Sequence, residues 1–166
     1  MQPLADKLRP KELEDMVGQS HIIGKGKIIN KLLDNNTIPN MILYGPPGTG
    51  KTTLANIIAN CTNKKYVKLN AVNCGVKEIK EVIDANKQDL FSYNGILLML
   101  DEIQALNRKQ QQSLLEVIED GSVTLIASTA DNPYFVVYKA ILSRSTIFEF
   151  KPIVKKDILK GLNRAL

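Results

Sequence analysis

One short segment of the chain has a spacing of glycine, lysine and threonine that suits phosphate chemistry. Residues 45–52 read Gly-Pro-Pro-Gly-Thr-Gly-Lys-Thr and satisfy the phosphate-loop pattern G-x-x-x-x-G-K-[ST] in full. Glycines let backbone N–H groups turn towards phosphate oxygens, Lys51 can reach the β- and γ-phosphates, and the Thr52 hydroxyl can ligate Mg²⁺. The pattern therefore predicts binding of a nucleoside triphosphate together with Mg²⁺.

The residues on either side of this segment supply the context that the pattern requires. Residues 41–44 form an apolar run typical of a buried strand, and residues 53–61 place their apolar side chains on one helical face. A helix that starts at the loop adds its partial positive charge to the phosphate site. This context disfavours the alternative of a simple glycine turn. We expect the nucleotide contacts to come from Gly45, Pro46, Pro47, Gly48, Thr49, Gly50, Lys51, Thr52 and Thr53.

A second chemical pattern is an apolar run that ends in two acidic residues. Residues 96–100 are followed by Asp101 and Glu102. A carboxylate at the end of such a strand lies beside the glycine loop, so we expect Asp101 to hold Mg²⁺ through its water shell. Glu102 is then placed to polarise the attacking water, which favours hydrolysis over phosphate transfer to a small molecule. For the acidic pair alone, a solvated loop or a helix N-cap is the alternative.

Five apolar runs of strand length alternate with helical patterns along the chain. The runs cover residues 41–44, 66–70, 96–100, 123–128 and 146–150. Helical patterns cover residues 26–33, 53–61, 77–90 and 109–119. Such alternation predicts a three-layer α/β/α sandwich around a parallel five-stranded sheet. We expect residues 1–153 to form this nucleotide-binding domain and residues 154–166 to begin a second, helical domain.

The composition limits the class of protein. With 166 residues, 44% of them hydrophobic, the chain can form the core of one domain and the beginning of a second. Most of the net charge of +5 lies in residues 151–166, so charge alone does not indicate a nucleic-acid surface. Cys61 and Cys74 indicate neither a zinc site nor a disulfide framework, which fits a reducing compartment. Without a membrane-length apolar run or a signal-peptide pattern, we expect a soluble cytoplasmic protein.

Residues 142–144 (LSR) precede a further strand. Taken together with the two motifs above, they make the chain resemble the AAA+ ATPases, and the resemblance spans the whole chain. Within that superfamily, an ordered set of short signatures is similar to the replication-associated recombination protein A family, bacterial relatives of clamp loaders and of the Holliday-junction branch-migration motor. The signatures are residues 1–5 (MQPLA), 8–10 (LRP), 17–19 (VGQ), 75–79 (GVKEI), 118–121 (IEDG) and 131–133 (DNP).

The resemblance implies an ATPase that maintains replication forks and acts in recombination and repair. ATP and Mg²⁺ would be its cofactors, and DNA, further copies of the chain and replication proteins would be its partners. Val17, Gly18 and Gln19 would line the adenine pocket, although an ordinary turn is the alternative. Arg144 would be an arginine finger that completes a neighbouring subunit's site, with a surface ion pair as the alternative.

The resemblance also implies a residue that senses the γ-phosphate near the end of the fourth strand. Thr129 is our choice for this sensor and Ser128 is the alternative, because Ala130 occupies one candidate position without a polar group. Asn70, which ends the second strand, would hold Glu102 away from the nucleotide as a switch, or would simply cap the strand. A second sensor arginine and an oligomerisation domain are expected after residue 166.

Four basic residues are candidates for contacts with DNA phosphates: Lys77 and Lys80 on one helix, and Arg108 and Lys109 at the start of another. The alternative is that they are merely solvated. His21 is expected to be a surface or capping residue. A clamp-loader-like scaffold, in which ATP binding rather than hydrolysis is the working event, is the alternative function, and Ala130 motivates it.

Overall fold

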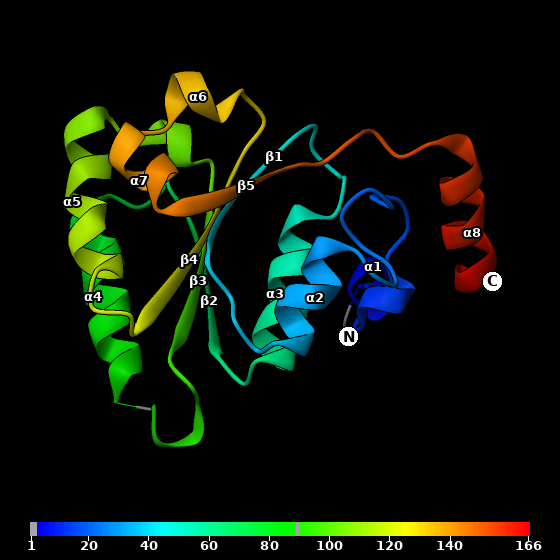
Figure 1. Ribbon diagram of the computed structural model, residues 1–166, viewed down its shortest axis with the longest axis horizontal. Coiled ribbons are helices and arrows are strands. Elements are labelled where there is room, and N and C mark those ends of the chain that lie inside the picture. Colours follow the sequence, from blue (N-terminus) through cyan, green and yellow to red (C-terminus); the bar gives the residue numbers. More distant parts are fainter. Residues whose placement is uncertain (1–2, 89) are drawn as a thin grey trace.

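A parallel sheet of five strands forms the centre of the structure, a computed structural model that describes residues 3–88 and 90–166 (Figure 1). Its strands lie in the order β2-β3-β4-β1-β5. They are β1 (Asn40–Tyr44), β2 (Lys65–Asn70), β3 (Ile96–Asp101), β4 (Val123–Thr129) and β5 (Ser145–Glu149). All four pairings are parallel. The predicted strands are confirmed, each with bounds within one residue.

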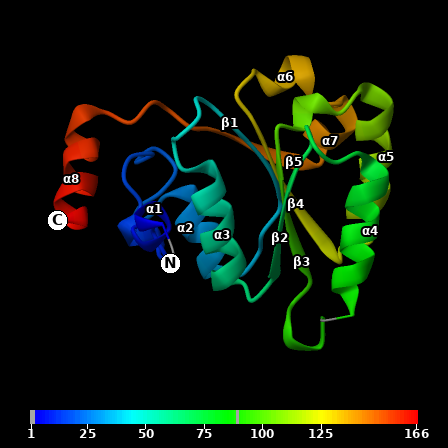
Figure 2. The same cartoon turned by 180° about the vertical axis from the view of Figure 1, so that it is seen from behind.

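Helices cover both faces of this sheet, so the predicted three-layer sandwich is confirmed (Figure 1, Figure 2). One face carries α2 (Ile28–Asp34) and α3 (Lys51–Cys61), and the other carries α4 (Val76–Lys87), α5 (Arg108–Ile118) and α7 (Lys139–Ser143). The short elements are α1 (Leu4–Lys7), α6 (Pro133–Val136) and the 3-10 turns η1 (Leu13–Asp15), η2 (Leu90–Ser92) and η3 (Ile103–Ala105). The last helix, α8 (Lys155–Ala165), stands away from the sheet.

The core consists of two apolar layers that are separated by the sheet. Alternate side chains of β3 point to opposite faces, so Leu98 packs towards α4 and α5 while Leu97 and Met99 pack towards α3. The five apolar residues of β3 are all fully buried. This burial explains why the strand reads as a continuous apolar run rather than as an alternating one.

Local signals fix where two of the helices begin. At α5, the Asn107 side chain accepts a hydrogen bond from the Gln110 N–H, and the Gln110 side chain accepts one from the Asn107 N–H. At α6, Asn132 caps the helix through the Tyr134 N–H. The helix predicted at 77–90 ends earlier, at Lys87. Residue 89 of that prediction, and residues 1–2 of the N-terminal signature, lie outside the described residues.

Candidate nucleotide-binding site

The phosphate loop leads from β1 into α3 along a path that requires glycine. Gly45 has a φ of +146°, and a Cβ atom there would lie 2.1 Å from the carbonyl oxygen of Phe150. The Gly45 N–H donates to the carbonyl of Thr129 at 3.2 Å, and the Thr49 hydroxyl donates to the carbonyl of Pro46 at 2.8 Å. The loop is therefore held between β4 and the end of β5 by backbone contacts that a side chain at position 45 would break.

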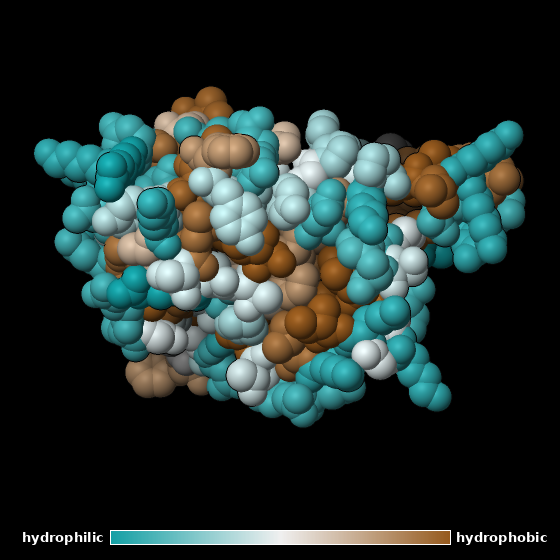
Figure 3. Space-filling model, turned by 45° about the horizontal axis from the view of Figure 1, so that its top comes forward, coloured by the Kyte–Doolittle hydropathy of each residue, from teal (hydrophilic) through white to brown (hydrophobic). Residues whose placement is uncertain are grey.

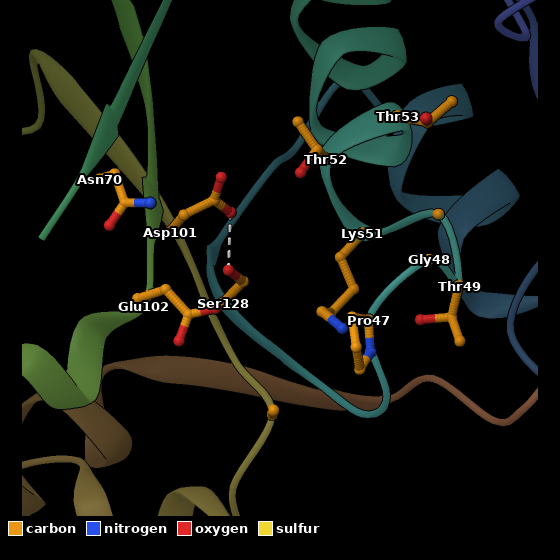
Figure 4. A pocket seen from close by; sticks show the side chains of 12 residues that line it. Pro47, Gly48, Thr49, Lys51, Thr52, Thr53, Asn70, Asp101, Glu102 and Ser128 are labelled. Atoms are coloured by element: carbon orange, nitrogen blue, oxygen red, sulfur yellow. Dashed lines mark hydrogen bonds between the residues drawn. The ribbon is translucent and has the colours of Figure 1, made fainter. Parts of the chain in front are cut away.

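A cavity of about 320 Å³ opens over this loop (Figure 4). It brings together residues that are separated in the sequence, because the carboxyl ends of parallel strands meet at one edge of the sheet. Seven of the nine predicted loop residues line it, and Gly45 and Pro46 lie behind them as partners of Lys51. The lining residues are Pro47, Gly48, Thr49, Gly50, Lys51, Thr52, Thr53, Asn70, Asp101, Glu102, Ser128 and Ala130.

The Lys51 ammonium group lies against the loop backbone. It donates to the carbonyls of Gly45 at 2.7 Å and Pro46 at 2.8 Å. Partial burial lowers the pKa of Lys51, while the charges of Glu102 and Asp101 oppose that shift. The lysine is thus a donor whose two carbonyl partners can be exchanged for phosphate oxygens at the same edge of the cavity.

Both oxygens of the Asp101 carboxylate have a partner. Ser128 donates its hydroxyl to Oδ1 at 2.7 Å, and the ammonium of Lys68 lies 3.6 Å from Oδ2. Asp101 and Thr52 line the same cavity, and their oxygen donors are of the kind that Mg²⁺ prefers. Within residues 3–88 and 90–166, no cluster of three or more His, Cys, Asp or Glu side chains could hold a metal. The residues therefore fit Mg²⁺ only if phosphate and water supply most of its ligands.

Glu102 has an unusual backbone conformation for a residue that follows a strand. Its φ of 59° and ψ of 48° are left-handed, and its side chain accepts a hydrogen bond from Nε2 of Gln104. Such a conformation costs on the order of 1 kcal/mol and is often found at functional sites. The sequence analysis did not identify Gln104. The feature that could have pointed to it is that Gln104 is the one amide side chain in the apolar segment that follows the acidic pair.

Asn70 lies at the cavity wall and also caps its own strand. Its Oδ1 accepts a hydrogen bond from the Val72 N–H at 2.9 Å, the capping role that was the simpler alternative. The hydrogen bond to Glu102 comes instead from Gln104. The inhibitory switch stays a prediction.

The sensor residue chosen from the sequence does not line the cavity. Thr129 is buried, and its hydroxyl oxygen accepts a hydrogen bond from the Asp131 N–H at 3.1 Å. Its neighbours Ser128 and Ala130 do line the cavity. Because successive side chains of a strand point to opposite faces, Thr129 points away from the face that Ser128 and Ala130 share. The sensor role stays a prediction, with Thr129 as the choice and Ser128 as the alternative.

The segment predicted to bind adenine lies between the phosphate loop and α8. A Cβ atom on Gly18 would lie 3.8 Å from the Asp157 carboxylate, and one on Gly161 would lie 3.5 Å from Val17. Gln19 is 5% exposed, and its amide is bonded to the backbone of Thr49 and Lys151. None of residues 17–19 lines the cavity over the loop. Their contact with adenine stays a prediction.

Arg144 lies at the C-terminal end of α7 and does not line the cavity. Its guanidinium donates to the carbonyl of Ala140 at 3.0 Å, at an exposed position. His21 lies at the surface, and its Nε2 is 2.7 Å from the carbonyl oxygen of Glu149. Among the described residues, no helix combines the length and the apolar content needed to cross a bilayer.

The sheet order, the glycine loop and the acidic end of β3 define a phosphate-loop nucleoside triphosphatase domain. Residues 41–153 match the model of the ATPase family associated with various cellular activities (AAA), and the chain belongs to this family. Membership implies ATP binding and ATP hydrolysis.

Similarity to particular relatives covers nearly the whole chain. Replication-associated recombination protein A of Haemophilus influenzae is 43% identical over 99% of the chain, and that of Escherichia coli K12 is 39% identical over 99%. The protein of the same name from Bacillus subtilis is 40% identical over the full chain. The resemblance stated from the signatures is thereby confirmed. The chain spans only 37–38% of the length of these relatives.

Solved structures of a second AAA+ protein have the same fold. The Thermotoga maritima RuvB Holliday junction branch migration motor superposes with a TM-score of 0.74 at 25% identity, over 95% of this chain and 53% of that one. A point mutant of the same RuvB protein gives a TM-score of 0.77 at 26% identity, over 95% and 54%.

Proposed function

We propose that this chain is the Mg²⁺-ATP-hydrolysing domain of a protein that acts on DNA at replication forks and in recombination and repair. In this proposal, hydrolysis drives rearrangement of an oligomer on the DNA. The observation that carries the enzymatic part is that Lys51, Thr52, Asp101 and Glu102 line one cavity. The DNA-directed part is supported by the names of the relatives, and the cytoplasm is the expected location.

Each of the four side chains has a separate task in the proposed reaction. Lys51 would bind the β- and γ-phosphates, while Thr52 and Asp101 would hold Mg²⁺, which would neutralise phosphate charge when bound. Glu102 accepts a hydrogen bond from the attacking water and orients it. Its bond with Gln104 holds the carboxylate at the end of β3.

The proposed catalytic glutamate is tested by ATP turnover, with and without forked or single-stranded DNA. We expect Glu102→Gln to lower turnover by about 10²- to 10⁴-fold, the range for loss of a general base. Binding of a fluorescent ATP analogue should persist in this variant. Glu119→Gln, at an exposed position that caps the end of α5, serves as the charge-matched control. Unchanged turnover in Glu102→Gln would show that the assignment is wrong.

We further propose that Arg144 acts in a neighbouring copy's site. Its exposed position outside the cavity supports this role, because an arginine finger must reach the active site of the neighbouring subunit. Arg144→Ala and Glu102→Gln should each lower turnover at least about 10²-fold on their own. Mixing them should restore part of it, because a Glu102→Gln copy supplies Arg144 to a partner that retains Glu102. If mixing restores nothing, the shared site is excluded.

A basic groove supports contact with DNA. A groove of about 630 Å³ at the N-terminal ends of α4 and α5 is lined by three lysines, Lys77, Lys80 and Lys109, and by one acidic residue, Glu78. Lys80 also pairs with Glu116 at 2.8 Å. Arg108, the fourth candidate, instead lies 5.6 Å from the ring centroid of Tyr138. Three of the four predicted residues therefore share one surface on which phosphates could bind.

We propose that residues 154–166 begin a helical lid domain. The apolar side chains of α8 lie exposed on the projection at the right of Figure 3. Those at least half exposed in residues 154–166 are Val154, Ile158, Leu159, Leu162 and Leu166. Such a face requires a packing partner, which further helices of a lid would supply.

A second candidate function is a nucleotide-gated scaffold in which ATP binding is the working event. It is favoured by Ala130, which brings no polar group to the cavity, and by Ser128, whose hydroxyl is engaged by Asp101. A Glu102→Gln protein that binds ATP without hydrolysing it separates the two functions. Normal recruitment of DNA and replication proteins by this variant would favour the scaffold.

A further inference from the structure

Asp101 is held by two partners of different charge. The hydroxyl of Ser128 is a neutral donor to Oδ1, and the ammonium of Lys68 lies 3.6 Å from Oδ2 (Figure 4 draws the first contact). The side chain of Asp101 is 18% exposed and that of Lys68 is 47% exposed. The carboxylate is therefore fixed at one oxygen by a buried residue and neutralised at the other by a cation with access to solvent.

The pleat of β2 places Lys68 at this position. Val67 and Leu69 pack into the core layer next to α4, so Lys68 and Asn70 point to the other face of the strand. Asn70 pairs with Asp101 in the sheet register, and Lys68 pairs with Met99 two residues earlier. The long lysine side chain thus runs along the edge strand towards the carboxyl end, where the cavity lies.

The charges around the cavity bear on how a metal can enter. Lys51 and Lys68 together offset the charges of Asp101 and Glu102, so the protein side chains alone hold no excess negative charge for Mg²⁺. A cation at Oδ2 opposes a second cation at the same carboxylate. Phosphate groups of a nucleotide add the negative charge that changes this balance.

We propose that Lys68 makes Mg²⁺ binding dependent on the nucleotide, by occupying the Asp101 oxygen that a metal ion would otherwise use. Free Mg²⁺ then binds weakly, and the metal enters together with the phosphates while Ser128 keeps the carboxylate in place. The inference rests on the proposed Mg²⁺-ATP site and adds a residue that sets when the metal binds.

The test compares Lys68→Met, which keeps an unbranched stem without charge, with Lys68→Arg, which keeps the charge. Lys68→Gln is a second neutral variant, and Lys31→Met at an exposed position of α2 controls for loss of a distant charge. The Mg²⁺ midpoint is read from binding of a fluorescent ATP analogue at increasing Mg²⁺, and Mg²⁺ binding without nucleotide is read by calorimetry.

We expect both neutral variants to lower the Mg²⁺ midpoint about three- to fivefold, the scale of a half-exposed ion pair. Their affinity for Mg²⁺ without nucleotide should rise by the same factor. Lys68→Arg and Lys31→Met should match the wild type. An unchanged or higher midpoint in both neutral variants, or an equal change in Lys31→Met, overturns the inference. If the wild type binds no nucleotide at all, the proposed function fails instead.

Discussion

The side-chain amide of Gln19 bonds to both the carbonyl and the N–H of Lys151, as the backbone of a neighbouring strand would. Its Nε2 donates to the Lys151 carbonyl at 2.8 Å, and its Oε1 accepts from the Lys151 N–H at 2.9 Å. The same Nε2 lies 3.3 Å from the carbonyl of Thr49 in the phosphate loop. One buried side chain therefore joins the N-terminal segment, the loop and the chain that leads to α8.

Replacing this amide should cost stability. Gln19→Ala leaves one buried and two partly buried backbone groups without this partner, and we expect the free energy of unfolding to fall by about 1–3 kcal/mol. Gln19→Glu should lose nearly as much, because a carboxylate can accept from the Lys151 N–H but cannot donate to either carbonyl. Urea denaturation measures both variants. A loss below about 0.5 kcal/mol in Gln19→Ala would contradict this account.

A side chain at Gly45 should disrupt the loop. The Cβ of Gly45→Ala would overlap the Phe150 carbonyl oxygen, so we expect a loss of about 2–4 kcal/mol in stability together with weaker nucleotide binding. Gly121→Ala is the matched control, since its φ of +79° is also left-handed but nothing lies within 4 Å of the added Cβ. That variant should lose only about 1 kcal/mol. Equal losses would mean that backbone strain, not the contact with Phe150, decides the effect.

Ser128 and Thr129 can be separated by experiment. Ser128→Ala removes the donor to Asp101, and we expect ATP turnover to fall about tenfold while the folded state is retained. Thr129→Val keeps the shape but removes the acceptor for the Asp131 N–H, so it should lower stability by about 1 kcal/mol and leave turnover nearly unchanged. Turnover and urea denaturation distinguish the two. The reverse pattern would restore Thr129 as the sensor.

The elements that the sequence predicts well are those encoded by neighbouring residues. The apolar run that forms β3 and the glycine pattern at 45–52 depend on local order, and both were located from the sequence. The choice between Ser128 and Thr129 required knowing which face of β4 each side chain points to, and a strand that is buried on both faces does not reveal this in its sequence. The contact of Lys68 with Asp101 joins two strands far apart in sequence, and only their register creates it.

Tyr66 makes the free energy of unfolding depend on pH in the alkaline range. Burial, and secondly the charge of Asp101, raises the pKa of Tyr66 to about 12, while Arg9 opposes the shift. Its hydroxyl is buried and has no hydrogen-bond partner within the described residues. The folded state therefore retains the phenol proton at a pH where the unfolded chain, with a tyrosine pKa of about 10, loses it.

This difference stabilises the folded state fully below about pH 10, and the contribution is lost as the pH rises towards 12. Because Tyr66 is only partly buried, we expect a loss of about 1 kcal/mol, measured as the difference between wild type and Tyr66→Phe in urea denaturation at pH 8 and 11.5. At pH 8, Tyr66→Phe should be as stable as the wild type, since it removes a hydroxyl without a partner. Tyr134→Phe, at a side chain 66% exposed, should follow the wild type at both pH values. The same pH dependence in wild type and Tyr66→Phe would assign the alkaline loss to other groups.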